Sequence, residues 1–287
     1  MDNPPRKIIE QVKDAINKSG FPLEMKVDQI LKPHGWYSRV GKLYRDFITE
    51  KIREIDIYAS KVVNGTQIEM VIACKQSEQH KLVLYTPQLD NYVNYFLEYF
   101  KGFPSKLSNP ASKYSNYDVS KAFYKLDLIK NSIPLAKKLI VCMNEKVTDA
   151  NQKYLSDFDS IIKYAISRTH LSDLQNNFRI INFFIMIFDG DIFSLTPSKN
   201  DKFDLKQIDY GKILYTTDFR FTDIDQAPTY NHKRNIKEVA NRFGDNFVIE
   251  IMTPAYFDQY LNHIQSILSN IDQSWLQNWG RESDLPF

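Results

Sequence analysis

The sequence predicts a mixed α/β fold, and three observations indicate it. Apolar residues recur with helical spacing in several segments, and short β-branched runs lie between those segments. A nearly continuous apolar run at 178–190 is typical of a strand that is buried on both faces. With 287 residues, 43% of them hydrophobic, the chain can bury a sizeable core.

The N-terminal part of the chain is predicted to alternate between helices and strands. The first helix carries its apolar residues on one stripe, which contains Ile8, Ile9, Val12, Ala15 and Ile16. Pro33 and Gly35 end the second helix. We expect helices over 4–20 and 21–35, a strand over 36–48, a β-hairpin over 54–77 and a short strand over 81–85.

The rest of the chain follows the same pattern. Segment 102–117 is rich in glycine, proline, serine and asparagine, which predicts a loop. Asp189-Gly190, between two apolar runs, predicts a turn rather than a pair of metal ligands. We expect further helices over 86–102, 148–168 and 254–268, and further strands over 137–143, 178–190, 211–217 and 246–253.

Asn64-Gly65 gives the hairpin a definite register. This dipeptide between two β-rich runs favours a two-residue type I′ turn. The register then pairs Val63 with Thr66, Ile57 with Ile72, Asp56 with Ala73 and Glu54 with Lys75.

Alternation along each strand then assigns the side chains of the hairpin to two faces. We expect an apolar face of Ile55, Ile57, Ala59, Ile68, Met70, Ile72 and Cys74. The opposite face gathers Glu54, Asp56, Tyr58, Ser60, Glu69, Val71, Ala73 and Lys75. The Cβ atoms of directly opposed residues lie ~4.5–5.5 Å apart. A carboxylate at position 73 would therefore be close enough to Asp56 for both to hold one hard cation.

The segments "REIDIYA" and "IEMVIACK" resemble the PD-(D/E)-x-K nuclease superfamily, which has a strand acid followed by acid-x-Lys on the next strand. Asp56 matches the first acid and Lys75 matches the lysine. The resemblance covers roughly residues 20–85. It implies a restriction-endonuclease-like fold, with a mixed central sheet flanked by helices on both sides. We expect a single such domain over 1–287, with core motifs at about 20–100 and elaboration over 102–287.

The same resemblance implies the roles of the site residues. Asp56 would be the principal ligand of Mg²⁺ or Mn²⁺, and the backbone carbonyl of Cys74 would be a second ligand. Lys75 would orient or activate the attacking water. Glu24, on the helix before the sheet, would hold a second ion or a metal-bound water. The implied substrate is nucleic acid, DNA more than RNA.

Ala73 departs from the motif, because alanine cannot bind a cation where the family has an acid. Three explanations are open: an inactivating substitution of a nuclease, a natural pseudo-nuclease, or an acid that has moved elsewhere. Glu54 and Glu69 are candidates for a moved acid, but Glu69 is four residues back, on the order of 13 Å along the strand. A single vacancy in an otherwise intact motif favours the first explanation. With Ala73 the chain should bind metal poorly and cleave little.

Simpler interpretations compete with this one. Asp56 and Lys75 could belong to an exposed hairpin face with a cross-strand ion pair between Glu54 and Lys75, which would contribute only ~0–1 kcal/mol. An acid in a first helical turn, such as Glu24, is favoured by the helix dipole alone. The alternative function is a non-catalytic pseudo-nuclease that binds nucleic acid or serves in an assembly.

The composition of the chain bears on its location in the cell, its metal sites and its partners. No apolar run reaches the ~18 residues of a membrane span, and the N-terminus lacks the apolar segment of a signal peptide. Cys74 and Cys142 lie in strand-like runs, which favours buried thiols and a cytoplasmic location. A net charge of +2 neither favours nor excludes nucleic acid. The five histidines show no zinc-ligand spacing. A homodimer or a protein partner is compatible with the sequence.

Overall fold

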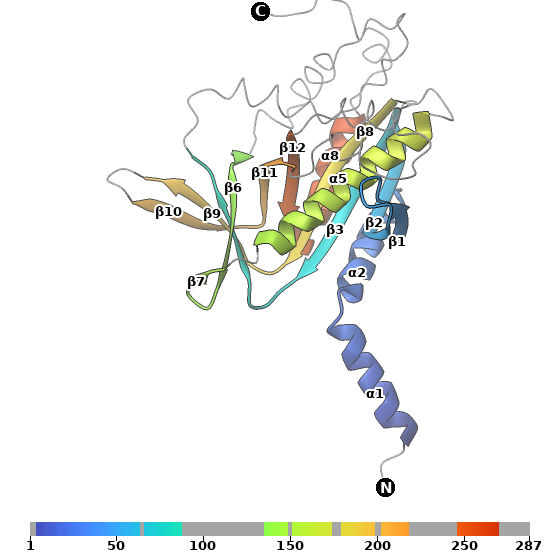
Figure 1. Cartoon of the computed structure of the whole chain (residues 1–287), viewed down its shortest axis with the longest axis horizontal. Helices are drawn as coiled ribbons and strands as arrows, with labels where there is room; N and C mark the ends of the chain where they lie inside the picture. The colour runs from blue at the N-terminus through green and yellow to red at the C-terminus, as the bar shows by residue number, and fades with distance from the viewer. Residues whose placement is uncertain are drawn as a thin grey trace, which may run out of the picture.

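The computed structural model describes residues 4–63, 66–87, 135–148, 151–173, 179–198, 202–217 and 246–269. In these residues the chain forms four α-helices and two mixed sheets, which confirms the predicted α/β class (Figure 1). The loop predicted over 102–117, and all of the helix predicted over 86–102 beyond residue 87, lie outside the described residues.

Seven strands form the larger sheet. In spatial order they are β1 (Tyr37–Arg45), β2 (Ile52–Val63), β3 (Thr66–Gln76), β8 (Arg179–Asp189), β12 (Asn246–Met252), β11 (Tyr210–Thr216) and β5 (Leu135–Ala136). The first three are antiparallel neighbours, whereas β8 runs parallel to both β3 and β12. The predicted hairpin is therefore joined to the buried strand that the apolar run at 178–190 indicated.

Five strands form the smaller sheet, which the sequence did not predict. Their spatial order is β10 (Phe203–Ile208), β9 (Ile192–Pro197), β4 (Lys81–Tyr85), β6 (Lys138–Met143) and β7 (Lys146–Val147). The strands expected over 81–85 and 137–143 are present, but they pair with each other rather than with the hairpin. Side chains from β4, β6 and β9 join the core on one side of the larger sheet.

The described helices are α1 (Pro4–Asn17), α2 (Phe21–Leu31), α5 (Asn151–Asp173) and α8 (Pro254–Ser269). Figure 1 shows α5 across one face of the larger sheet and α2 and α8 on the other face. Successive residues of β8 alternate between the two cores, because Phe184, Met186 and Phe188 pack on the α5 side and the residues between them on the other. None of the described helices combines the length and apolar character needed to cross a bilayer.

The first helix forms where the sequence predicts it, but its apolar stripe is not part of the core. Ile8, Ile9 and Val12 are each more than half exposed. Figure 1 shows α1 extending away from the two sheets. Periodicity therefore predicted the helix correctly without predicting what its apolar face contacts.

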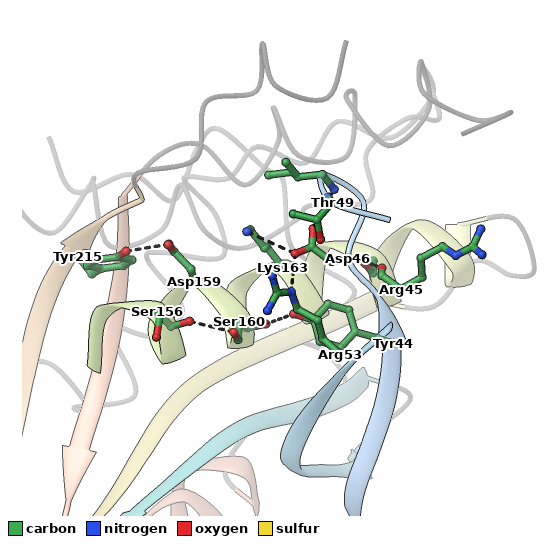
Figure 2. Close-up of polar contacts among 12 residues, drawn as sticks. Tyr44, Arg45, Asp46, Thr49, Arg53, Ser156, Asp159, Ser160, Lys163 and Tyr215 are labelled. Carbon is green, nitrogen blue, oxygen red and sulfur yellow. Dashed lines mark hydrogen bonds and ion pairs between the residues drawn. The ribbon is translucent and has the colours of Figure 1, made fainter. Parts of the chain in front are cut away.

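The turn between β1 and β2 is fastened to α5 through Asp46, which is fully buried. Its carboxylate accepts hydrogen bonds from the backbone N–H groups of Ile48 (2.8 Å) and Thr49 (3.1 Å) and from Arg53 Nε (2.9 Å). Lys163 of α5 lies 3.6 Å away, and Figure 2 shows Arg53 and Lys163 pointing toward Asp46. This network holds one edge of the sheet against the helix.

Candidate active site

The predicted register of the hairpin is confirmed from Ile57↔Ile72 to Val63↔Thr66. The predicted turn residues, Asn64 and Gly65, lie outside the described residues. Regular pairing between β2 and β3 ends at Ile57 and Ile72, one residue before the predicted pair of Asp56 with Ala73. The two strands therefore separate at the candidate site.

Asp56 lies at the point where the strands separate. Its carboxylate accepts a hydrogen bond from the backbone N–H of Cys74, with Oδ2 2.7 Å from the nitrogen. The side chain thus lies beside the peptide bond that joins Ala73 to Cys74, which is the neighbourhood that the sequence predicted. Asp56 is only partly buried, so its carboxylate is not sealed in apolar packing.

The strand β2 is irregular at Asp56, and the predicted assignment of Ile55 to the same face as Ile57 was wrong as a result. Ile55 packs in the core on the α5 side, whereas Ile57 packs on the other side. Residues two apart in a regular strand share a face, so the strand twists at Asp56. On β1, Gly41 adopts a left-handed backbone conformation (φ +64°) between the residues that pair with Ile55 and Ile57. Glycine tolerates this conformation, and the distortion aims Asp56 toward β3.

Lys75 forms an ion pair with Asp157 of α5, with 3.1 Å between Nζ and Oδ1. The competing interpretation, an ion pair between Lys75 and Glu54 on an exposed face, is therefore wrong. The side chain of Lys75 is 26% exposed and that of Asp157 is 20% exposed. The two groups lie between the sheet and the helix, and the hairpin face that carries Lys75 is largely covered by α5.

Asp157 is a site residue that the sequence analysis missed. Its Oδ2 is buried and has no hydrogen-bond partner among the described residues. A signal was present, because Asp157 follows Tyr154 by three positions and precedes Ile161 by four, and both are buried on α5. A carboxylate on the core side of an amphipathic helix is costly unless it is paired or binds a cation.

Position 73 faces the same helix. Ala73 is 4% exposed and packs in the α5-side core with Tyr58 and Val71. A longer acidic side chain at position 73 would therefore point toward α5. Asp157 extends from α5 toward β3. Its carboxylate therefore lies on the face of the sheet where a strand acid at position 73 would place one.

Burial raises the pKa of each acid of the site, and the Asp56 charge adds to this effect at Glu24 and Asp157. Burial raises the pKa of Asp56, although the Cys74 N–H and Lys75 oppose this change. Burial and the Asp56 charge likewise raise the pKa of Asp157, again opposed by Lys75. The pKa of Glu24 is raised by burial, then by Asp56 and Glu54, and Lys75 lowers it. These effects indicate that α2, β2 and α5 contribute acids to one region around Lys75 of β3.

Cys74 contributes only its backbone to the site. The side chain is buried on the α2 side, and burial, Asp56 and Glu24 raise the pKa of the thiol well above its ordinary value. The thiol is therefore protonated at neutral pH and is a poor ligand or nucleophile. The role predicted for its carbonyl remains a prediction.

The residues present fit a hard divalent cation with few protein ligands. Among the described residues, no three His, Cys, Asp or Glu side chains gather as a group that could hold a metal. Mg²⁺, however, keeps several waters and is commonly bound through one or two carboxylates together with substrate phosphates. Asp56 and the partnerless Oδ2 of Asp157 supply oxygen donors of that kind.

No family model, no curated protein and no solved structure matches this chain.

Proposed function

We propose that this chain is a metal-dependent nuclease of restriction-endonuclease-like design, in which Asp157 of α5 replaces the strand acid missing at position 73. One observation carries the proposal. Asp157 is paired with Lys75 through one oxygen and has a second, buried oxygen with no hydrogen-bond partner among the described residues, and it lies near enough to Asp56 for the Asp56 charge to raise its pKa. The proposed substrate is nucleic acid, and DNA is the first to test.

In this proposal Asp56, Asp157 and the Cys74 carbonyl would hold Mg²⁺ or Mn²⁺, and Glu24 would bind a water or a second ion beside it. The bound ion would supply Lewis-acid stabilisation of the phosphate and lower the pKa of a water. Lys75 would hold the attacking water and stabilise negative charge on the phosphate. The Cys74 N–H fixes the direction of the Asp56 carboxylate, because it donates to Oδ2 over 2.7 Å.

A non-catalytic pseudo-nuclease is the second candidate, and Ala73 favours it. The alanine is well packed in the core, and no group of three metal-binding side chains occurs in the described residues. Such a protein would keep the fold and bind nucleic acid or a partner without cleaving.

A cleavage assay on single-stranded and duplex DNA and on RNA, with Mg²⁺ or Mn²⁺, separates these candidates. We expect the chain as it stands to cleave at least one substrate. Asp56→Asn and Asp157→Asn should each reduce the rate by a factor on the order of 10²–10³, since each removes an electrostatic partner of the transition state. Asp159→Asn is the matched control, because Asp159 lies on the same helix but accepts a hydrogen bond from Tyr215 instead (2.7 Å; Figure 2).

Moving the acid between the two positions tests the replacement itself. The double variant Ala73→Glu with Asp157→Ala returns the carboxylate to the strand and should recover activity that Asp157→Ala alone loses. Activity in Ala73→Glu but none in the unchanged chain would show that Asp157 does not replace the acid. If neither protein cleaves any substrate, the nuclease proposal fails and the pseudo-nuclease remains.

A further inference from the structure

A second feature of the molecule is a pocket of about 400 Å³ between β1, β2, the start of β3 and the C-terminal half of α5. Its lining does not include Asp56, Lys75 or Asp157. Its volume is within the range of small-molecule and cofactor sites, which begins at ~300 Å³. The pocket is therefore large enough for a ligand of nucleotide size.

The pocket is lined by positive charge. Arg39, Lys42, Arg45 and Arg168 contribute to its walls, and no acidic side chain of the described residues does. Behind the lining lies the fully buried carboxylate of Glu69, whose Oε1 is 3.6 Å from Arg168 Nε. One acid offsets only part of four positive charges, so the pocket favours an anion.

Aromatic rings form much of the remaining wall. Tyr44, Tyr58 and Tyr164 are buried at its floor, and Tyr37 is 54% exposed at its rim. Tyr164 contacts both other floor rings, with centroids 5.5 Å from Tyr44 and 5.6 Å from Tyr58. Tyrosine rings held in this way offer a rigid surface for an aromatic ligand.

Polar groups without partners are found in the lining of the pocket and behind it. Tyr164 is 3% exposed, and its hydroxyl has no hydrogen-bond partner among the described residues. Oε2 of Glu69 also lacks one, although Oε1 accepts a hydrogen bond from the Tyr58 hydroxyl over 2.7 Å. Next to Glu69, on β8, the side-chain amide of Asn182 is buried without a partner in the described residues. Buried polar groups without partners are rare in folded proteins and indicate a ligand, an ion or water.

We propose that this pocket binds a nucleotide unit, with its phosphate held by the arginines and its base against the tyrosine floor. Arginine is well suited to phosphate because its guanidinium group donates two parallel hydrogen bonds. Two residues of the lining provide polar contacts for the edge of a base: the hydroxyl of Tyr164, and the side-chain oxygen of Gln67, whose Nε2 already donates to Glu69. The nucleotide can be free or part of a single strand, because the chemistry of recognition is the same.

The proposal does not depend on the nuclease proposal, since it uses no residue of the candidate active site. The two sites are nevertheless near each other. Tyr164 and Arg168 follow Asp157 by seven and eleven residues on α5, which places them about 10–17 Å farther along the helix axis. A strand held in the pocket could therefore extend to Lys75 within a few nucleotides.

Titration of the protein in EDTA tests the pocket without cleavage. The probes are 5′-AMP, adenosine, inorganic phosphate and a fluorescein-labelled eight-nucleotide single-stranded DNA. We expect saturable binding of 5′-AMP or of the oligonucleotide that is weakened about tenfold or more by Arg39→Ala with Arg45→Ala. Both arginines are exposed, so the double variant should fold. Tyr164→Phe, which removes only the hydroxyl, should weaken binding about three- to tenfold.

The control Lys138→Ala with Lys206→Ala removes two positive charges from exposed positions in the smaller sheet. It should bind as the unchanged protein does. Binding of 5′-AMP identifies a free nucleotide as a sufficient ligand, and binding of the oligonucleotide alone identifies a strand. The proposal is overturned if neither probe binds saturably, or if the arginine variant and the lysine control bind equally well.

Discussion

Asp56 holds a carboxylate where burial disfavours its charge. The backbone N–H of Cys74 and the ammonium group of Lys75 compensate in part, yet the net effect is a raised pKa. A residue kept in an unfavourable state by its surroundings is typical of a functional site, because binding of a ligand can relieve the cost. Burial also disfavours the charged form of Asp157, which has one oxygen paired with Lys75 and the other without a partner in the described residues.

At the residue scale we predict that Asp56→Asn stabilises the protein in the absence of metal. The substitution removes the charge and keeps an oxygen that can accept from Cys74. Because the pKa of Asp56 is raised in the folded state, the wild-type carboxyl stabilises the fold when it is protonated, and this contribution is lost as the pH rises through the folded-state pKa.

The melting temperature of Asp56→Asn in EDTA at pH 8 should therefore exceed that of wild type by roughly 2–4 °C. The difference should shrink as the pH falls toward 4. Asp204→Asn, at an exposed position on β10, is the control and should not change the melting temperature. A variant less stable than wild type at pH 8 would count against the description of the site.

At the element scale, local patterns predicted most helices and strands because the signals lie within a few residues. The Asn-Gly dipeptide predicted the register that the described residues of the hairpin show, and the apolar run at 178–190 predicted the buried strand β8. Ile55 was assigned to the wrong face because the twist at Asp56 depends on Gly41, in a neighbouring strand. Asp157 was missed for a similar reason, since its partner Lys75 is 82 residues earlier in the chain.

The contrast between α5 and α1 gives a second prediction. Phe158→Ala should lower the free energy of unfolding by about 3–5 kcal/mol, because the phenyl ring is fully buried in the α5-side core. Ile8→Ala should change it by less than ~0.5 kcal/mol, because Ile8 is 59% exposed. Urea unfolding measures both. Equal losses would mean that the stripe of α1 is buried.

Asp46 gives a third prediction, because its network joins the β1–β2 turn to α5. Asp46→Ala should cost roughly 2–4 kcal/mol of unfolding free energy at pH 7, since it leaves partly buried donors, among them two cations, without the buried carboxylate that accepts from them. Burial alone would raise the pKa of Asp46, but the Ile48 N–H and Lys163 outweigh it and hold the pKa below 3.8. The stabilisation is therefore present above that value and is lost as the pH falls through the lower folded-state pKa.

Urea unfolding at a series of pH values tests this assignment. The difference between Asp46→Ala and wild type should be constant from pH 7 to about pH 5 and should decrease at more acid pH. A loss below ~1 kcal/mol at pH 7 would mean that the network contributes little.

At the scale of the whole molecule, two sheets and the helices on both faces of the larger one bring together residues from four elements. The sequence predicted the acid and the lysine of the hairpin, together with Glu24 on α2. It did not predict the smaller sheet or the order of the strands, because long-range pairing has no local signal. The central claim concerns this assembly: Asp56 of β2 and Asp157 of α5 form one cation site beside Lys75 of β3.

Calorimetric titration with Mn²⁺ at pH 7.5 tests that claim most directly. We predict one binding site per chain that is lost or weakened at least tenfold in both Asp56→Asn and Asp157→Asn and is retained in Asp159→Asn. Absence of saturable Mn²⁺ binding, or binding that both substitutions leave unchanged, would contradict the account.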